Sequence, residues 1–169
     1  MPKFTFTPRG GAYVGNNDYW TANDAVFPAG AKGTEIGVND QPVVVYPKNE
    51  DEHVFFGGVV RSGYIGALIS LDLFWVSPGT GGDVFWRVAW ERDATGKDIA
   101  VDTFATEKTV ASTAPAIAGK VAKASLLFTQ AQADGIVAGD PYRLRVRRDT
   151  SDPLDTLDED AELFRVAVN

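Results

Sequence analysis

The feature that most constrains the fold is an alternation of apolar and charged residues in two segments of the last third, residues 142–149 and 161–168. Such period-two alternation is typical of strands that bury one face in a core and expose the other to water. In a third segment, residues 83–90, every second position from Val84 to Trp90 is valine or tryptophan, which predicts one buried face. We therefore expect a β-sandwich in which the last two segments form the closing antiparallel pair.

Eight segments have the composition and length of strands, and clusters of turn-forming residues separate them. They are residues 43–46, 53–60, 67–76, 84–91, 101–112, 121–128, 142–148 and 161–168. Strands without long helices between them are typical of a jelly roll, a double Greek key or an immunoglobulin-like sandwich, and the last of these lacks its cysteine pair here. We predict an all-β fold, a single jelly-roll-like antiparallel β-sandwich of about eight strands over residues 41–169.

The first 40 residues are expected to form an irregular N-terminal arm, because they are rich in Gly, Asn, Asp and Thr and show little periodicity. An irregular segment of this length that carries aromatic side chains suggests a surface that docks onto a partner. The candidate partner-binding residues are Phe4, Phe6, Tyr13, Tyr19, Trp20 and Phe27. The alternative is that these aromatic side chains cap the open end of the sandwich.

Length and composition limit the number of domains and the classes of partner. A chain of 169 residues, 44% of them hydrophobic, can bury one core and is too short for two ordinary domains. The formal charge of -7 disfavours nucleic acid as a partner, because nucleic-acid binding needs a basic surface. The absence of cysteine excludes disulfides and thiolate chemistry. We expect no signal peptide, because the N-terminus lacks a basic region followed by an apolar one. We expect no membrane partner, because no apolar run approaches the roughly 20 residues that span a bilayer.

The sequence gives little support for catalysis, and we expect neither enzymatic activity nor a cofactor. His53, the only histidine, follows the acidic residues 50–52, but no activated serine accompanies it, which favours a solvated histidine at a strand end. Residues 79–82 are rich in glycine but lack the features of a phosphate-binding loop, so we expect a hairpin turn there. Three tryptophans could stack on sugars, although core packing is the commoner fate of such residues. These are Trp75, Trp86 and Trp90.

The densest acidic segment, residues 149–162, directly follows four arginines and could either bind calcium or neutralise those arginines. The arginines are Arg143, Arg145, Arg147 and Arg148, and the aspartates considered are Asp149, Asp152, Asp155, Asp158 and Asp160. The spacing does not match an EF-hand loop, and no glycine makes its sharp turn. We therefore expect charge pairing between strands rather than a metal site.

Several segments together resemble small β-sandwich proteins of tailed bacteriophage particles. They are LDLFWV (71–76), DVFWRVAW (83–90), AKASLLF (122–128), AGDPYRLRVRRD (138–149) and DEDAELFRV (158–166). Proteins of this kind occur as capsid decoration or cement proteins and as modules of tail fibres and baseplates. The resemblance covers roughly residues 67–169 and rests on strand patterns rather than on a chemical signature.

The resemblance implies a non-enzymatic virion structural protein, made in the host cytoplasm and located on the capsid surface. Its implied partner is the major capsid protein, and its implied assembly is a homotrimer. One domain without heptad repeats, carrying a docking arm, favours decoration of a preformed shell. The alternative is a tail fibre or baseplate module that binds host surface glycan.

Overall fold

The computed structural model describes residues 18–28, 35–38, 41–98 and 100–169, which form ten strands and two short 3-10 helices. In chain order these are β1 (Asp18–Thr21), η1 (Ala22–Asp24), β2 (Glu35–Val38), β3 (Gln41–Tyr46), β4 (His53–Val59), β5 (Ile69–Val76), β6 (Asp83–Arg92), β7 (Lys108–Thr113), β8 (Ala122–Phe128), η2 (Ala131–Ala133), β9 (Pro141–Arg148) and β10 (Ala161–Val168). Among the residues that the structure describes, no helix is long and apolar enough to cross a membrane.

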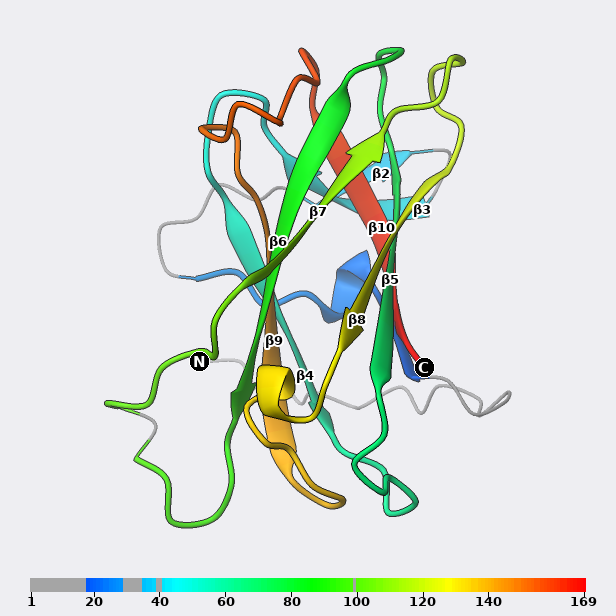
Figure 1. Ribbon diagram of the computed structural model, residues 1–169. Coiled ribbons are helices and arrows are strands. Elements are labelled where there is room, and N and C mark those ends of the chain that lie inside the picture. Colours follow the sequence, from blue (N-terminus) through cyan, green and yellow to red (C-terminus); the bar gives the residue numbers. More distant parts are fainter. Residues whose placement is uncertain (1–17, 29–34, 39–40, 99) are drawn as a thin grey trace, which may run out of the picture.

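The strands form two antiparallel sheets that pack face to face (Figure 1). Sheet A has the order β2-β3-β10-β5-β8, with β1 also paired to β10, and sheet B has the order β4-β9-β6-β7. The eight strands β3 to β10 pair first with last, second with second-last and so on inward. The pairs are β3·β10, β4·β9, β5·β8 and β6·β7, and this order is the topology of a jelly roll. The predicted fold class is confirmed. Strands β3 to β10 match the eight predicted segments, although β7 begins at Lys108 rather than near residue 101.

The expected pairing of the last two strands is wrong. Strand β9 pairs with β4 and β6 in sheet B, whereas β10 pairs with β1, β3 and β5 in sheet A. The reason is that period-two alternation reveals which side of a strand is buried but does not identify the neighbouring strand. The loop of residues 149–160 therefore crosses from one sheet to the other instead of closing a hairpin.

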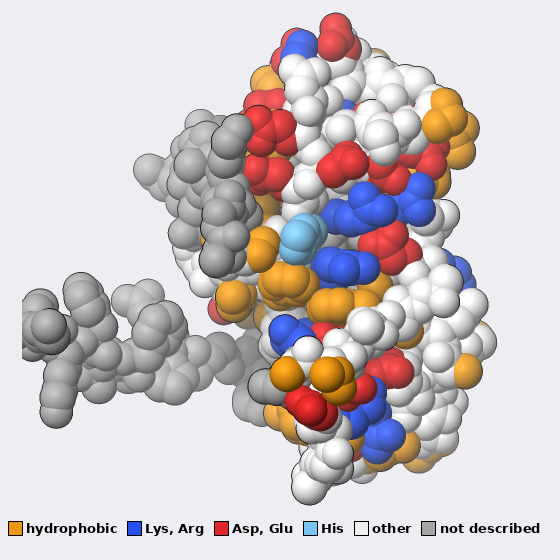
Figure 2. All heavy atoms as spheres, turned by 90° about the vertical axis from the view of Figure 1, so that its left-hand side faces the viewer, with side chains coloured by type: hydrophobic (Ala, Val, Ile, Leu, Met, Phe, Trp, Pro, Cys, Tyr) orange, Lys and Arg blue, Asp and Glu red, His pale blue; other side chains and the backbone are white. Residues whose placement is uncertain are grey.

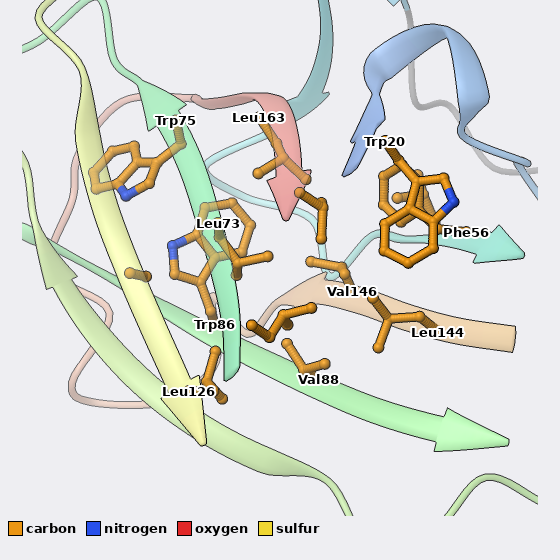
Figure 3. Close-up of a cluster of buried hydrophobic side chains, with 14 of the residues drawn as sticks. Trp20, Phe56, Leu73, Trp75, Trp86, Val88, Leu126, Leu144, Val146 and Leu163 are labelled. Carbon is orange, nitrogen blue, oxygen red and sulfur yellow. The ribbon is translucent and has the colours of Figure 1, made fainter. Parts of the chain in front are cut away.

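The core lies between the two sheets and is centred on tryptophans from β5 and β6. Figure 3 shows Trp75 and Trp86 there, and their ring centroids are 6.1 Å apart in an edge-to-face arrangement. Trp90 is equally buried and packs edge-to-face on Phe128. The expectation that these tryptophans are core residues is confirmed, because alternation along β6 turns Trp86 and Trp90 to the inner face.

Regular structure also forms within the region that we expected to be irregular. Strand β1 pairs with the end of β10, with Asp18 opposite Val168, and β2 pairs with β3. Trp20 on β1 is buried, and its Nε1 donates a hydrogen bond to the carbonyl oxygen of Gly57 at 3.0 Å. A strand of four residues is too short for periodicity to reveal, so the sequence pattern missed β1 and β2.

Candidate interaction surfaces

The structure describes three of the six candidate partner-binding residues, Tyr19, Trp20 and Phe27. Phe4, Phe6 and Tyr13 lie outside the described residues. Trp20 belongs to the core, and Phe27 is half-buried against it. Tyr19 is the exposed one of the three that are described, with 49% of its surface accessible. Alternation along β1 explains the contrast between Tyr19 and Trp20, because consecutive side chains of a strand point to opposite faces.

Tyr19 belongs to the outer surface of sheet A, which we call face A. Face A is formed by Tyr19, Asp72, Phe74, Lys123, Ser125, Phe164 and Arg165. The Arg165 guanidinium lies 5.5 Å from the centroid of the Tyr19 ring, and the Phe74 and Phe164 rings are 6.4 Å apart. Face A therefore combines aromatic rings and charged groups on four neighbouring strands, β1, β10, β5 and β8.

A β-bulge shapes the centre of face A. The register between β10 and β5 shifts between Leu163, which lies opposite Trp75, and Arg165, which lies opposite Phe74. The extra residue, Phe164, packs its ring against that of Phe74 on the outer surface. Consecutive side chains, Phe164 and Arg165, thus reach the same face, which a regular strand would not allow.

The outer surface of sheet B, which we call face B, carries four of the nine arginines of the chain. Face B is formed by His53, Phe55, Arg87, Arg143, Arg145 and Arg147, and by Phe104 and Glu107 of the loop of residues 93–107. Figure 2 shows basic side chains across the middle of this face, with acidic side chains between them and hydrophobic ones beside them.

Glu107 is the centre of the ion pairs on face B. It accepts hydrogen bonds from Arg147 at 2.9 and 3.0 Å and from Arg145 at 3.0 Å, and Arg87 lies 3.8 Å away. The hydrogen bond from Arg147 is the main reason that the pKa of Glu107 is lowered, and it outweighs burial, which raises the pKa. Glu107 therefore stays ionised at neutral pH and fixes the loop to β9.

Aromatic stacking fixes the same loop. Phe104 stacks on Phe55 with a centroid distance of 5.6 Å and an interplanar angle of 15°. The Arg145 guanidinium lies 4.6 Å from the centroid of Phe104. With Phe55 and Arg145 both against its ring, Phe104 leaves little aromatic surface for a partner.

His53 begins β4 and lies opposite Arg147, at the strand end where the sequence placed it. The pKa of His53 is lowered, mainly by burial and further by the positive charges of Arg145 and Arg147. The imidazole is therefore mostly neutral at pH 7. The expectation that His53 is not catalytic stays a prediction.

The connecting loops gather at two ends of the sandwich (Figure 1). One end, which we call the acidic end, consists of the loops of residues 47–52, 77–82, 114–121 and 149–160. These loops are joined by hydrogen bonds from Lys48 N to Asp160, from Thr150 N to Asp51 and from Gly119 N to Ser77 O. Acidic residues dominate them, and the basic residues in these loops are Lys48 and Lys120.

Arg148 organises the acidic end from inside. Its side chain is fully buried and donates two hydrogen bonds to Asp155, at 2.9 and 2.7 Å. It also donates to the carbonyl oxygens of Leu157 and Glu159, at 2.6 and 2.7 Å. One buried guanidinium thereby fixes the acidic loop in place.

The glycine-rich residues 79–82 contribute to the acidic end, and the expected hairpin turn is wrong. The loop connects β5 in sheet A to β6 in sheet B. It lines an open groove of about 440 Å3 together with residues 156–159. Gly82 has a φ of +83°, and a Cβ there would lie 2.7 Å from the carbonyl oxygen of Thr156, so the close approach requires glycine.

The opposite end, which we call the aliphatic end, consists of the loops of residues 60–68, 93–107 and 129–140. Val60 N donates to Asp140 O at 2.8 Å, and Lys97 Nζ lies 2.9 Å from Asp134, so the three loops form one surface. Its exposed aliphatic side chains are Val59, Ile65, Leu68, Val101 and Val137, of which Ile65 is 90% accessible. This end was not predicted from the sequence, because isolated aliphatic residues in loops carry no pattern.

No protein-family model and no curated protein matches this chain. Among solved structures it is similar to CBM35 from Cellvibrio japonicus Abf62, with 8% identity, a TM-score of 0.48, and coverage of 91% of this chain and 93% of that chain. It is also similar to TmCBM61 in complex with beta-1,4-galactotriose, with 8% identity, a TM-score of 0.36, and coverage of 90% and 87%. A third similar structure is that of infectious bursal disease virus Gx strain, with 12% identity, a TM-score of 0.42, and coverage of 99% of this chain and 35% of that chain. Likeness at this level identifies neither a ligand nor a partner, and the jelly roll follows from the strand order itself.

Proposed function

We propose that this chain is a non-enzymatic structural protein of a bacteriophage virion, a capsid decoration or cement protein that binds the outer surface of the head and stabilises it. The observation that carries the proposal is the unequal distribution of exposed large aliphatic side chains, five at the aliphatic end against three, Ile117, Val121 and Leu154, at the acidic end. A protein that covers a shell needs one surface for attachment and another that faces water. The partner at the aliphatic end is then the major capsid protein.

The aliphatic end has the properties of an attachment surface. Ile65 and Leu68 are largely exposed, and burying one such side chain against a shell would contribute about 1.5–3 kcal/mol. The N-terminal arm joins the sandwich towards the same end, because Asp18 lies opposite Val168 and Ser70 pairs with Asn169. The arm and the aliphatic end can therefore contact one partner together.

The acidic end suits the solvent side of such an assembly. Many copies that present acidic loops outward would repel one another between particles and keep virions dispersed. A homotrimer at a symmetric position of the shell would add the contacts of three aliphatic ends, so that weak individual contacts give a stable attachment through avidity.

The copy number per virion tests this proposal. Gel densitometry of purified particles should give hundreds of copies per virion, and labelling with antibody should place them on the head. A handful of copies located at the tail would overturn the capsid assignment.

Variants test the attachment surface. The double variant Ile65→Asp, Leu68→Asp of the full chain should no longer bind to phage heads that were purified without this protein. The matched control Ile117→Asp should bind to them normally. Ile117 is 57% accessible but lies at the acidic end. An arm deletion should stop at residue 17, because Asp18–Thr21 is a strand of sheet A. Normal binding by the double variant would exclude the aliphatic end.

The second candidate function is a tail fibre or baseplate module that binds host surface glycan. Face A favours it, because Tyr19 and Arg165 are exposed beside the Phe74 and Phe164 pair. The same densitometry separates the two candidates, since a tail module would be present in few copies.

A further inference from the structure

We propose that face A is a binding site for acidic polysaccharide, in which the aromatic side chains stack on sugar rings and Arg165 pairs with a sugar carboxylate. This goes beyond capsid decoration, because face A is formed by strands of sheet A, whereas the aliphatic end is formed by loops. The ligand class is a glycan of uronic acid or another carboxylated sugar.

The state of Arg165 is the first argument. Arg87, Arg92 and all four arginines of β9 lie within ion-pair distance of a carboxylate in their own chain. Arg165 contacts the Tyr19 ring, and within the described parts of the chain no carboxylate lies at ion-pair distance from it. An exposed guanidinium without a carboxylate partner can pair with a carboxylate of a ligand, and this local pairing must outweigh the repulsion between an anionic ligand and a chain of net charge -7.

The second argument is the arrangement of rings and polar groups around Arg165. The bulge of β10 brings Phe164 to the outer surface beside Phe74, and Tyr19 flanks them on β1. Aromatic faces bind the apolar C–H faces of sugar rings. The strands β1, β10, β5 and β8 span about 14 Å at the usual strand spacing, which accommodates a short oligosaccharide.

Hydrogen-bonding side chains lie at the β8 side of the same face. Asp72 accepts a hydrogen bond from Ser125 at 2.5 Å and lies 3.4 Å from Lys123. The Lys123 side chain is 51% exposed, so its ammonium group can still donate hydrogen bonds to a ligand. Sugar hydroxyl groups can form hydrogen bonds with these polar side chains while the aromatic rings of face A stack on the polysaccharide.

A glycan fits face A better than an acidic peptide does. Peptides that bind sheets use the free backbone groups of an edge strand. At the centre of face A, β10 is paired on both sides, by β5 and by β3 and β1, and β5 lies between β10 and β8. Recognition there must depend on side chains, which is how sugars are bound.

The test measures binding of the full chain to polygalacturonate by affinity electrophoresis and calorimetry. Its fully methyl-esterified form serves as the neutral counterpart, and polyglutamate and dextran sulfate serve as other polyanions. We expect binding to polygalacturonate and weak or no binding to the other three. Equal binding to polyglutamate or dextran sulfate would show general anion binding and overturn the assignment, and so would no binding to polygalacturonate.

Variants locate the site on face A. Arg165→Ala and Tyr19→Ala should each weaken binding about tenfold or more, and Arg165→Lys should restore only part of it, because lysine keeps the charge but loses the planar fork. The matched control is Arg145→Ala on face B, which should bind normally. Thermal melts check that each variant is folded. Equal losses for Arg165→Ala and Arg145→Ala would move the site away from face A. The outcome is independent of the virion copy number, so this proposal and capsid decoration can fail separately.

Discussion

Faces A and B both combine arginine and aromatic side chains, but they use them differently. On face B, Glu107 is shared by Arg145 and Arg147, and Phe104 is covered by Phe55 and Arg145. On face A, Arg165 has the Tyr19 ring as its contact among the described residues, and both side chains are exposed. A count of arginines and aromatics would therefore favour face B, although its arginines already pair with carboxylates of the same chain.

A single loop accounts for the difference. Residues 93–107 connect β6 to β7 and lie across face B, where Ala89 and Glu91 of the outer side of β6 are almost completely buried. Loops of this length without secondary structure are uncommon in compact domains. Glu107 and Phe104 supply the contacts that keep this one in place. The paired arginines of face B therefore hold this loop against the sheet.

The largest expected effect concerns Arg148, the arginine of β9 that points away from face B into the protein. Arg148→Met should lower the free energy of unfolding by about 3–5 kcal/mol, because it leaves the buried Asp155 carboxylate unpaired. Urea unfolding at neutral pH measures the loss. The double variant with Asp155→Leu should recover part of it, and a loss under about 1 kcal/mol would mean that water replaces the guanidinium.

On face B itself, Glu107→Gln should cost about 1–2 kcal/mol, since it removes the charge shared by partly buried arginines. The matched control on face A is Asp72→Asn, whose partners Ser125 and Lys123 are exposed. That variant should cost under about 1 kcal/mol. If Asp72→Asn lowered the free energy of unfolding more than Glu107→Gln, the conclusion that ion pairs stabilise face B more than face A would be wrong.

Acidification should weaken face B through the same carboxylate. The Arg147 hydrogen bond lowers the pKa of Glu107 below its ordinary value of 4.5, so Glu107 stabilises the fold above that value and loses its contribution as the pH falls through the lower folded pKa. The stability difference between the native chain and Glu107→Gln should therefore shrink from about pH 7 to about pH 3. Unfolding curves at several pH values measure it, and a constant difference would show that the charge of Glu107 is not responsible.

The sequence predicted the strands well because each jelly-roll strand alternates and ends in a turn, as the positions of β5, β6 and β8 show. It also predicted the tryptophan core. It did not predict that β9 and β10 lie in different sheets, because alternation contains no information about neighbours. Face A was missed as well, although adjacent Leu163 and Phe164 interrupt the alternation of β10 and mark the bulge.

Arg165→Ala should change stability by no more than about 0.5 kcal/mol, because an exposed side chain whose described contact is one ring contributes little. The same substitution at Arg147 should cost clearly more, since Arg147 makes two hydrogen bonds to Glu107. Thermal melts of the two variants measure the contrast. A large loss for Arg165→Ala would mean that Arg165 holds the fold together and would weaken its assignment as a ligand group.

The smallest expected effect is that of chelators on the acidic loop. Its aspartates have partners within the protein: Asp152 pairs with Arg87, Asp155 with Arg148, and Asp158 with Lys48. Among the residues that the structure describes, no group of three or more acidic or histidine side chains is arranged to hold a metal ion. EDTA should therefore leave the melting temperature unchanged, and added salt should shift it only slightly, because exposed pairs are weak and screened. A fall of several degrees in EDTA that calcium reverses would instead make the acidic end a metal site, by the linkage of binding to folding.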